Sequence, residues 1–175
     1  FGLELNTTNT LLTGNWKIKS TDDPNYSGAG QNPSACYRKS KLNGMAEMDW
    51  NNSTNDFNYE YTMEHSIYLK LPQSLVQGKT YIIEINSNTN TDIVSQTIEF
   101  DIFNSLSDAI HLNLVGFLDD NSIKTSDLYL WMGSGNARDY EGFVGNKVYI
   151  YNTQTQESTE VAVVEFWKPN ASEAG

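Results

Sequence analysis

Residues 67–85 read IYLKLPQSLVQGKTYIIEI, and this stretch decides the fold class of the chain. Apolar residues alternate with other residues before the turn signal Gln77-Gly78 and again after it. Alternation with a period of two places one set of side chains on a buried face of a β-strand and the other set on the opposite face. The stretch therefore predicts two strands joined by a turn, as in an antiparallel sheet.

The same alternation recurs along the chain, separated by clusters of Gly, Asn, Asp and Ser that are typical of turns. Several strands at short spacing predict an all-β fold, namely an antiparallel immunoglobulin-like or jelly-roll β-sandwich with long N-terminal loops. We expect one β-sandwich module over residues 1–168 and a linker or tail over residues 169–175. Further strands are expected at residues 3–5, 16–19, 59–63, 98–102, 110–114, 128–132, 148–151 and 161–165. Long polar loops are expected at residues 22–32 and 51–58.

The composition excludes several classes of partner. The 175 residues include 22 acidic and 11 basic side chains, which gives a formal net charge of −11. Nucleic acids and anionic membrane surfaces are bound through clustered Lys and Arg, so we expect neither partner. The mean hydropathy is −0.51, and no apolar run approaches the ~20 residues of a membrane span, so we expect no membrane insertion.

Cysteine usage and residue preferences give weaker information about the compartment. Cys36 is the only cysteine, which rules out an intrachain disulfide and a Cys-x-x-Cys metal site. Abundant Asn and Thr with scarce Arg favour an extracellular bacterial protein, so we expect a secreted or cell-surface location. Because the chain opens at Phe1 without Met, we expect a processed fragment of a longer protein.

Residues 109–117, AIHLNLVGF, resemble the opening strand of the immunoglobulin-like N-terminal module of family 9 cellulases. That module begins with a similar I-x-V-N-Q-V-G-Y string, although Leu114 stands where the family has Gln and Phe117 where it has Tyr. The similarity covers roughly residues 67–167 and extends to related bacterial polysaccharide-degrading proteins. In that family the module is a β-sandwich that packs beside a separate catalytic barrel and contains no catalytic residues.

The resemblance implies a non-catalytic accessory module of a secreted bacterial polysaccharide-degrading protein. Its expected partners are a neutral polysaccharide or an adjacent catalytic domain. Two alternatives remain open: a stand-alone carbohydrate-binding module or cell-surface interaction domain, and a fragment of a glycoside hydrolase. We expect no catalytic residue in the chain itself, because Glu64 and His65 would point to opposite faces of a strand and no catalytic signature surrounds Cys36.

Aromatic side chains are the main candidates for a binding site. Alternation over residues 128–132 places Tyr129 and Trp131 on the outward face, and the same parity places the tyrosines at positions 68, 149 and 151 outward. Large exposed apolar groups often mark an interaction site. Sugar rings present C–H faces that stack on Trp and Tyr, while acids and amides bind their hydroxyls. The alternative is that these rings pack under a long loop or against a neighbouring domain.

Four further residues are candidates for the same binding function. Trp50 precedes an Asn-rich segment, and Tyr26 lies in the loop over residues 22–32, so both are candidates for stacking on a sugar. Arg138 and Asp139 lie in a polar loop, where charged groups make strong hydrogen bonds to hydroxyls. The alternative for this pair is a solvated turn with a local ion pair. Of the other tryptophans, we expect Trp16 in the core and Trp167 against a sheet edge.

Paired acids suggest one possible metal. Asp119 and Asp120, followed by Asn121, offer oxygen ligands of the kind that Ca²⁺ prefers, and so does the pair Asp22-Asp23. Neither pair has the spacing of an EF-hand loop. We therefore expect no organic cofactor and keep a structural calcium ion as an alternative, with Asp119 and Asp120 as its candidate ligands.

Overall fold

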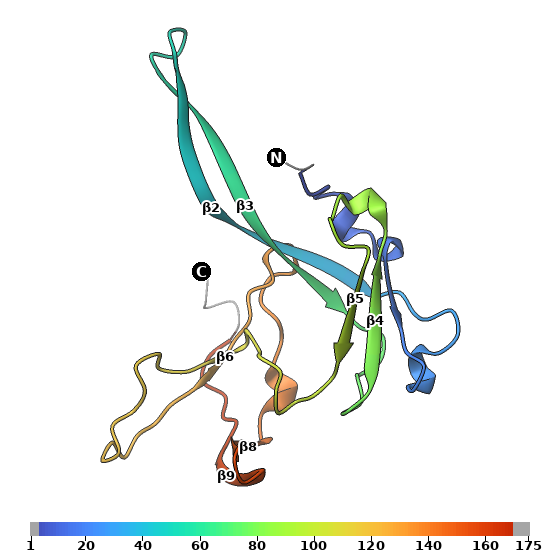
Figure 1. Ribbon diagram of the computed structural model, residues 1–175. Coiled ribbons are helices and arrows are strands. Elements are labelled where there is room, and N and C mark those ends of the chain that lie inside the picture. Colours follow the sequence, from blue (N-terminus) through green and yellow to red (C-terminus); the bar gives the residue numbers. More distant parts are fainter. Residues whose placement is uncertain (1–3, 170–175) are drawn as a thin grey trace.

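The computed structural model describes residues 4–169, and all paired strands in it are antiparallel (Figure 1). Its helices are 3-10 turns of three residues each, so the protein is all-β and antiparallel, as the alternation predicted. The strands are β1 (Trp16–Lys19), β2 (Ala35–Asn51), β3 (Asp56–Lys70), β4 (Thr80–Ile85), β5 (Ser95–Glu99), β6 (Ile110–His111), β7 (Asp127–Leu128), β8 (Lys147–Asn152) and β9 (Glu157–Val163). The 3-10 turns are η1 (Asn9–Leu11), η2 (Thr13–Asn15), η3 (Pro24–Tyr26), η4 (Ser87–Thr89), η5 (Gly133–Gly135) and η6 (Glu141–Phe143).

A three-stranded sheet in the order β1-β4-β5 forms the body of the molecule. Its core is a cluster of Ile18, Tyr26 and Tyr81, against which partly buried aliphatic residues and Phe100 pack. Trp16 is also buried, which confirms the expectation for this residue, and its indole Nε1 donates to the backbone oxygen of Thr10 at 2.9 Å. The body is therefore held by a few large side chains around the central strand β4.

The expected loop over residues 22–32 is part of this core. Asp23 caps η3 by accepting a hydrogen bond from the backbone N–H of Asn25 at 2.9 Å, and this turn places Tyr26 over the sheet. The Tyr26 ring meets Tyr81 edge to face, with 5.5 Å between the ring centroids. Its hydroxyl donates to the backbone oxygen of Gln73 at 2.5 Å. The loop therefore has a packing role.

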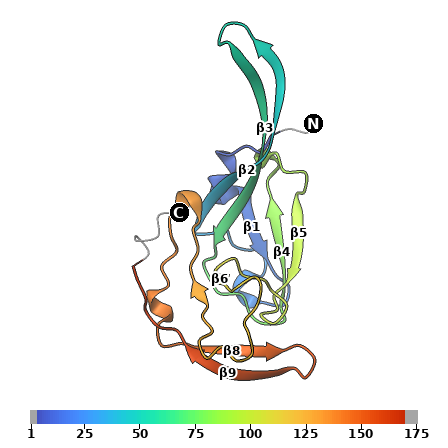
Figure 2. The ribbon, with the colours of Figure 1, turned by 90° about the vertical axis from the view of Figure 1, so that its left-hand side faces the viewer.

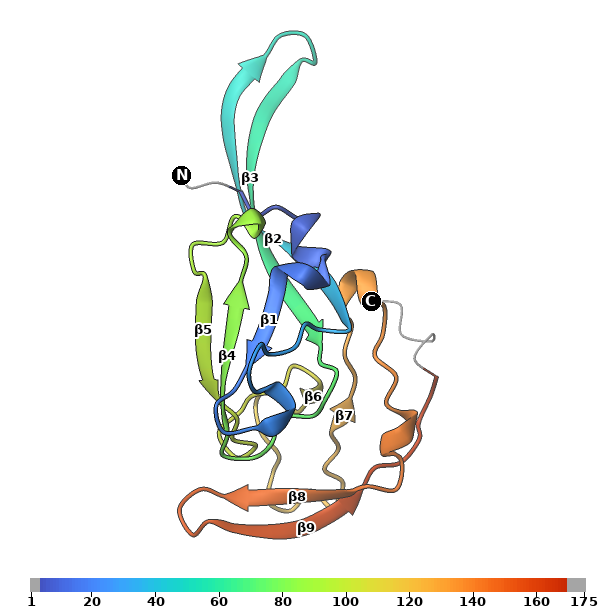
Figure 3. The same ribbon diagram turned by 90° about the vertical axis from the view of Figure 1, so that its right-hand side faces the viewer.

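β2 and β3 form a long hairpin whose outer part projects away from the body (Figures 1, 2 and 3). We call residues 42–63 of this hairpin the arm. The pairing runs from Ala35 opposite Lys70 at the base to Asn51 opposite Asp56 at the tip. The sequence predicted only parts of β3 and a polar connection over residues 51–58. β2 was not predicted, and the expected connection over residues 51–58 was too long, because the turn at the tip is confined to residues 52–55.

The remaining strands form two smaller hairpins, β6–β7 and β8–β9, and the second lies below β6, to the side of the β1-β4-β5 sheet (Figure 1). The strand expected over residues 110–114 pairs only at Ile110 and His111. Leu114, expected to be buried, is fully exposed, and Ile150 is 63% exposed. Both residues were expected to face inward. Leu114 is exposed because strand pairing ends at His111, and Ile150 is exposed because no other sheet within residues 4–169 covers its side of β8.

The structure tests only one of the two expectations about the end of the chain. Trp167 is 72% exposed, and its ring lies 4.2 Å from the Lys168 Nζ atom, so the expected packing against a sheet edge was wrong. The proposed tail over residues 169–175 lies outside the described residues except for Pro169. No helix in the part of the chain from residue 4 to residue 169 has the length and apolar character that crossing a membrane requires.

Candidate functional site

Three of the aromatic residues singled out in the sequence meet at one hollow beneath the arm. Tyr68 comes from the base of β3, while Tyr129 and Trp131 follow β7. The hollow has a volume of about 430 Å³. Its lining consists of Lys39, Tyr68, Ser107, Asp108, Ile110, His111, Tyr129, Leu130 and Trp131. The site therefore combines three rings with cationic, anionic and hydroxyl groups.

Backbone hydrogen bonds fix the two ring-bearing residues that follow β7. The Tyr129 N–H donates to the oxygen of Ala109 at 2.9 Å, and the Tyr129 oxygen lies 2.9 Å from the His111 Nε2 atom. Trp131 forms an isolated antiparallel bridge with Ala137. These contacts extend the β6–β7 pairing past its last regular residue and hold Tyr129 and Trp131 in place.

The turn η5 attaches this segment to the hairpin. The Ser134 Oγ atom accepts a hydrogen bond from the Arg38 N–H at 3.0 Å. A Cβ atom at Gly135 would lie 2.5 Å from the Tyr37 Cγ atom, so only a residue without a side chain fits this contact. Gly133 has φ +62° and approaches the Arg38 backbone closely, which again suits glycine. The Gly-Ser-Gly sequence therefore docks the aromatic segment against β2.

Burial and a nearby negative charge raise the pKa of Tyr68 in the hollow. Burial raises the pKa of the Tyr68 hydroxyl, and the negative charge of Asp108 raises it further, against a smaller opposing effect of a hydrogen bond with Ser66. Tyrosine is protonated at neutral pH, and the raised pKa extends this state to more alkaline pH, so Tyr68 can donate a hydrogen bond. Asp108 offers acceptor oxygens and Lys39 offers donors on the same lining. The hollow can thus donate hydrogen bonds to a ligand hydroxyl group and accept hydrogen bonds from it, beside an aromatic ring on which the ligand can stack.

The other sequence candidates lie outside this hollow. Trp50 is at the arm tip, where its ring meets Phe57 edge to face at 5.1 Å. Arg138 lies over the Tyr140 ring at 5.4 Å, and the Asp139 Oδ1 atom accepts from the Glu141 N–H at 2.8 Å. Arg138 and Asp139 form a structured turn, and they are not paired with each other among the ion pairs of residues 4–169.

The expectation that Tyr26 is a surface residue for ligand stacking was wrong. Its exposed fraction is 0%, because η3 turns the ring into the core of the body. The five rings expected on outer faces also do not share one surface. Tyr151 stacks on Phe103 with 4.1 Å between centroids, and Tyr149 is exposed on β8, outside the lining of the hollow.

The predicted alternation of inward and outward side chains over residues 128–132 is correct only in part. All five residues are half-buried, and Leu130, expected to face inward, lines the same hollow as Tyr129 and Trp131. Regular pairing ends at Leu128, so strict alternation does not continue beyond it. Lys39 and Asp108 were missed. Lys39 could not be identified because the sequence pattern did not predict β2. Asp108 directly precedes the motif over residues 109–117 and could have been included as a candidate with that motif.

The acid pairs singled out as possible calcium ligands lie in hydrogen-bonded turns. The Lys124 Nζ atom donates to the backbone oxygens of Asn121 at 2.7 Å and Asp119 at 3.5 Å, which places a cation in this turn. Within residues 4–169, no group of three or more His, Cys, Asp and Glu side chains could hold a metal ion. The Asp23 Oδ2 atom accepts from the Tyr81 hydroxyl at 2.6 Å. The calcium expectation therefore stays a prediction.

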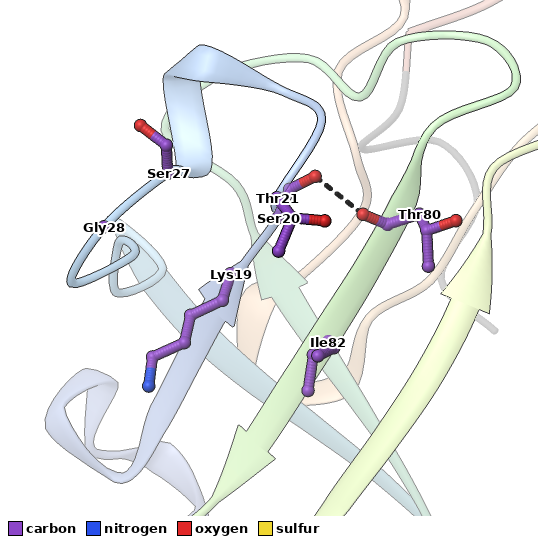
Figure 4. A pocket seen from close by; sticks show the side chains of 7 residues that line it. All are labelled: Lys19, Ser20, Thr21, Ser27, Gly28, Thr80 and Ile82. Atoms are coloured by element: carbon purple, nitrogen blue, oxygen red, sulfur yellow. Dashed lines mark hydrogen bonds between the residues drawn. The ribbon is translucent and has the colours of Figure 1, made fainter.

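A second hollow of about 320 Å³ lies between the segment that follows β1 and the start of β4 (Figure 4). Two of its polar side chains already have partners: the Ser20 Oγ atom donates to the Thr80 oxygen at 2.7 Å, and Lys19 pairs with Glu84 at 2.7 Å. No aromatic ring lines it. The hollow at the base of the arm is therefore the better candidate for binding.

Comparisons of the chain with protein-family models, curated proteins and solved structures found no match. The side chains of the hollow beneath the arm and the exposed apolar surfaces of the molecule are therefore the indications of function.

Proposed function

We propose that this chain is a non-catalytic accessory module of a secreted bacterial polysaccharide-degrading protein and that it binds a neutral polysaccharide at the hollow beneath the arm. The convergence of Tyr68, Tyr129 and Trp131 from separate segments on one hollow is the observation that carries this proposal. The rings supply faces for stacking on a sugar. Asp108, Lys39 and the neutral Tyr68 hydroxyl supply hydrogen bonds to its hydroxyl groups.

The charge of the molecule supports a neutral ligand. A net charge of −11 disfavours polyanions such as nucleic acids and acidic glycans, whereas a neutral chain pays no electrostatic penalty. The resemblance of residues 109–117 to the accessory module of family 9 cellulases points in the same direction. An immunoglobulin-like arrangement and a secreted or cell-surface location belong to this proposal.

A second candidate role is to support an adjacent catalytic domain. Leu114 and Val115 are 103% and 95% exposed, next to the motif that carries the resemblance. Fully exposed neighbouring apolar side chains of this kind often mark a protein interaction site. In this role the aromatic hollow would bind no glycan, so a glycan-binding measurement separates the two candidates.

The test is affinity electrophoresis of the wild-type chain in gels that contain a panel of soluble neutral polysaccharides. We expect retardation by at least one of them. Trp131→Ala removes a stacking face and should weaken binding by about 10-fold or more, which corresponds to at least about 1.4 kcal/mol. The backbone bridge of Trp131 to Ala137 needs no indole ring, so the variant should retain its fold, as checked by circular dichroism.

Tyr149→Ala is the matched control, because Tyr149 is an exposed aromatic residue on β8 outside the hollow. It should be retarded as strongly as the wild type. The glycan proposal is wrong if no polysaccharide in the panel retards the wild-type chain. Equal loss of binding in Trp131→Ala and Tyr149→Ala would also contradict it.

A further inference from the structure

The arm has one apolar face and one polar face. β3 alternates without interruption, so its odd positions from Phe57 to Met63 share one face, and their partners across the hairpin extend that face onto β2. The apolar arm face consists of Leu42, Met45, Trp50, Phe57, Tyr61 and Met63, with exposed fractions between 40% and 59%, and the pair Tyr59–Glu47 lies on the same side. The opposite face of β3 contains Asp56, Asn58, Glu60, Thr62 and Glu64.

The same face is covered at the base of the hairpin. There Cys36, opposite Leu69, is only 8% exposed. Farther out the hairpin leaves the body, and the described residues provide nothing that packs on the face (Figures 1 and 2). A two-stranded ribbon is marginally stable in water by itself, so the apolar arm face needs a cover.

The accessible surface of the whole chain agrees with a missing cover. It measures 12,992 Å². A folded monomer of this mass is expected to expose about 8,600 Å². The excess of about 4,400 Å² is comparable to the area that large permanent interfaces remove from water.

We propose that a second copy of this chain covers the apolar arm face, in a symmetric dimer in which two arms stack face to face. Six half-exposed large side chains present on the order of 600 Å² per copy, so a pair would bury about 1,200 Å², which reaches the lower end of specific interfaces. This area fits a dimer that forms at micromolar concentrations.

The order of side chains along the face favours a self-complementary contact. Trp50 and Phe57 lie at the tip, while Leu42 and Met63 lie opposite each other nearer the body. Two arms that run in opposite directions place the tip rings of one copy over the aliphatic and thioether groups of the other. Methionine sulfur makes favourable contacts with aromatic rings.

Charge and chemistry argue against other occupants of this face. The acids of β3 lie on the opposite face and stay in water when two arms stack, whereas Glu47 of β2 stands opposite Tyr59 and brings one carboxylate per copy to the apolar side. Sugars require hydrogen-bonding groups beside the rings, whereas leucine and methionine occupy half of the apolar arm face. The net charge of −11 opposes an anionic membrane surface.

The test is sedimentation equilibrium of the wild-type chain from about 1 to 200 μM, a range chosen to bracket the micromolar dissociation constant that this interface size suggests. We expect a monomer–dimer equilibrium that strengthens with added salt, because salt screens the repulsion between two acidic chains. Tyr61→Lys places a charge in the apolar arm face and should weaken dimerisation at least 10-fold.

Thr62→Lys is the matched control, because it changes the net charge equally at the next position but on the polar face. It should dimerise as the wild type does. If Tyr61→Lys fails to fold by circular dichroism, Met45→Lys on the apolar face and Ala46→Lys on the polar face form a second matched pair.

Three outcomes overturn the proposal. The first is a wild-type chain that stays monomeric over the whole range. The second is a dimer that Tyr61→Lys leaves unchanged or that both lysine variants weaken equally. The third is binding of the monomer to neutral phosphatidylcholine vesicles without self-association, which would assign the face to a lipid surface. The hollow lies at the base of the hairpin, so glycan binding and dimerisation can fail independently.

Discussion

At the scale of single residues, the buried hydrogen bond between Asp23 and Tyr81 joins the loop that follows β1 to the central strand β4. Tyr81 is fully buried, its hydroxyl donates to the Asp23 Oδ2 atom at 2.6 Å, and the same hydroxyl oxygen accepts from the Val76 N–H at 2.9 Å. Burial raises the pKa of Tyr81, and its hydrogen bond to Asp23 raises it further. Burial also raises the pKa of Tyr26.

These shifts predict an alkaline limit of stability. A folded-state pKa above the unfolded value means that the unfolded chain loses its tyrosine protons first as the pH rises. The contribution to stability is therefore complete below about pH 10, the ordinary tyrosine pKa, and is lost progressively above it. We expect the urea midpoint of unfolding to stay level from pH 7 to pH 9 and to fall between pH 10 and pH 11.

The variant Tyr81→Phe separates this effect from general alkaline damage. At pH 7 it should lose about 1–3 kcal/mol of stability, because the buried Asp23 carboxylate loses a hydrogen-bond donor. Between pH 9 and pH 11 its midpoint should fall less than that of the wild type. Tyr149→Phe changes an exposed tyrosine and should follow the wild type at every pH. Parallel curves for wild type and Tyr81→Phe would show that Tyr81 does not set the limit.

At the scale of elements, β2 and β3 show what the sequence could and could not predict. β3 alternates without a break, so parts of it were found from the sequence. β2 contains two irregularities, between Leu42 and Gly44 and between Glu47 and Trp50. At each irregularity β2 contains one residue more than β3. The extra residue changes whether odd-numbered or even-numbered side chains of β2 lie on a given face. The apolar residues of β2 therefore lack a single period, although they share one face.

The candidate site shows the same limit. Tyr129 and Trp131 were identified because they stand in an alternating segment, but the sequence does not indicate that Tyr68 lies beside them. That proximity depends on the docking of η5 against β2, which pairs residues almost a hundred positions apart. Tyr26 was misplaced for a related reason: a loop rich in Pro, Gly and Asn is typical of surface segments, and its burial comes from contacts with residues far along the chain.

The docking of η5 provides a prediction at this scale. Gly135→Ala places a Cβ atom against the Tyr37 ring, so the turn must move away from β2. Because the same segment carries Trp131, we expect both a lower melting temperature and weaker polysaccharide binding, measured by thermal denaturation and affinity electrophoresis. Gly142→Ala is the control, because a Cβ atom there meets nothing within 4 Å. Gly135→Ala with unchanged stability and binding would show that the η5 contact does not position the site.

At the scale of the whole molecule, burial is unevenly distributed. The sheet β1-β4-β5 has a small well-filled core, while the arm, the segment around Leu114 and the hairpin β8–β9 expose many apolar side chains. Large apolar surfaces of this kind favour binding to other molecules. The body supplies the ordered framework, and the two proposals assign the hollow to a glycan and the arm to a second copy.

The single thiol of the chain offers a measure of how often the base of the hairpin opens. Cys36 is 8% exposed, and burial raises its pKa, so both access and thiolate formation are suppressed in the closed state. Each alkylated chain therefore records one opening event, with no second cysteine to complicate the mass spectrum. We expect slow labelling by iodoacetamide at pH 8 in the native chain and rapid labelling in urea. Fast labelling of the native chain would mean that the junction between the hairpin and the body opens frequently.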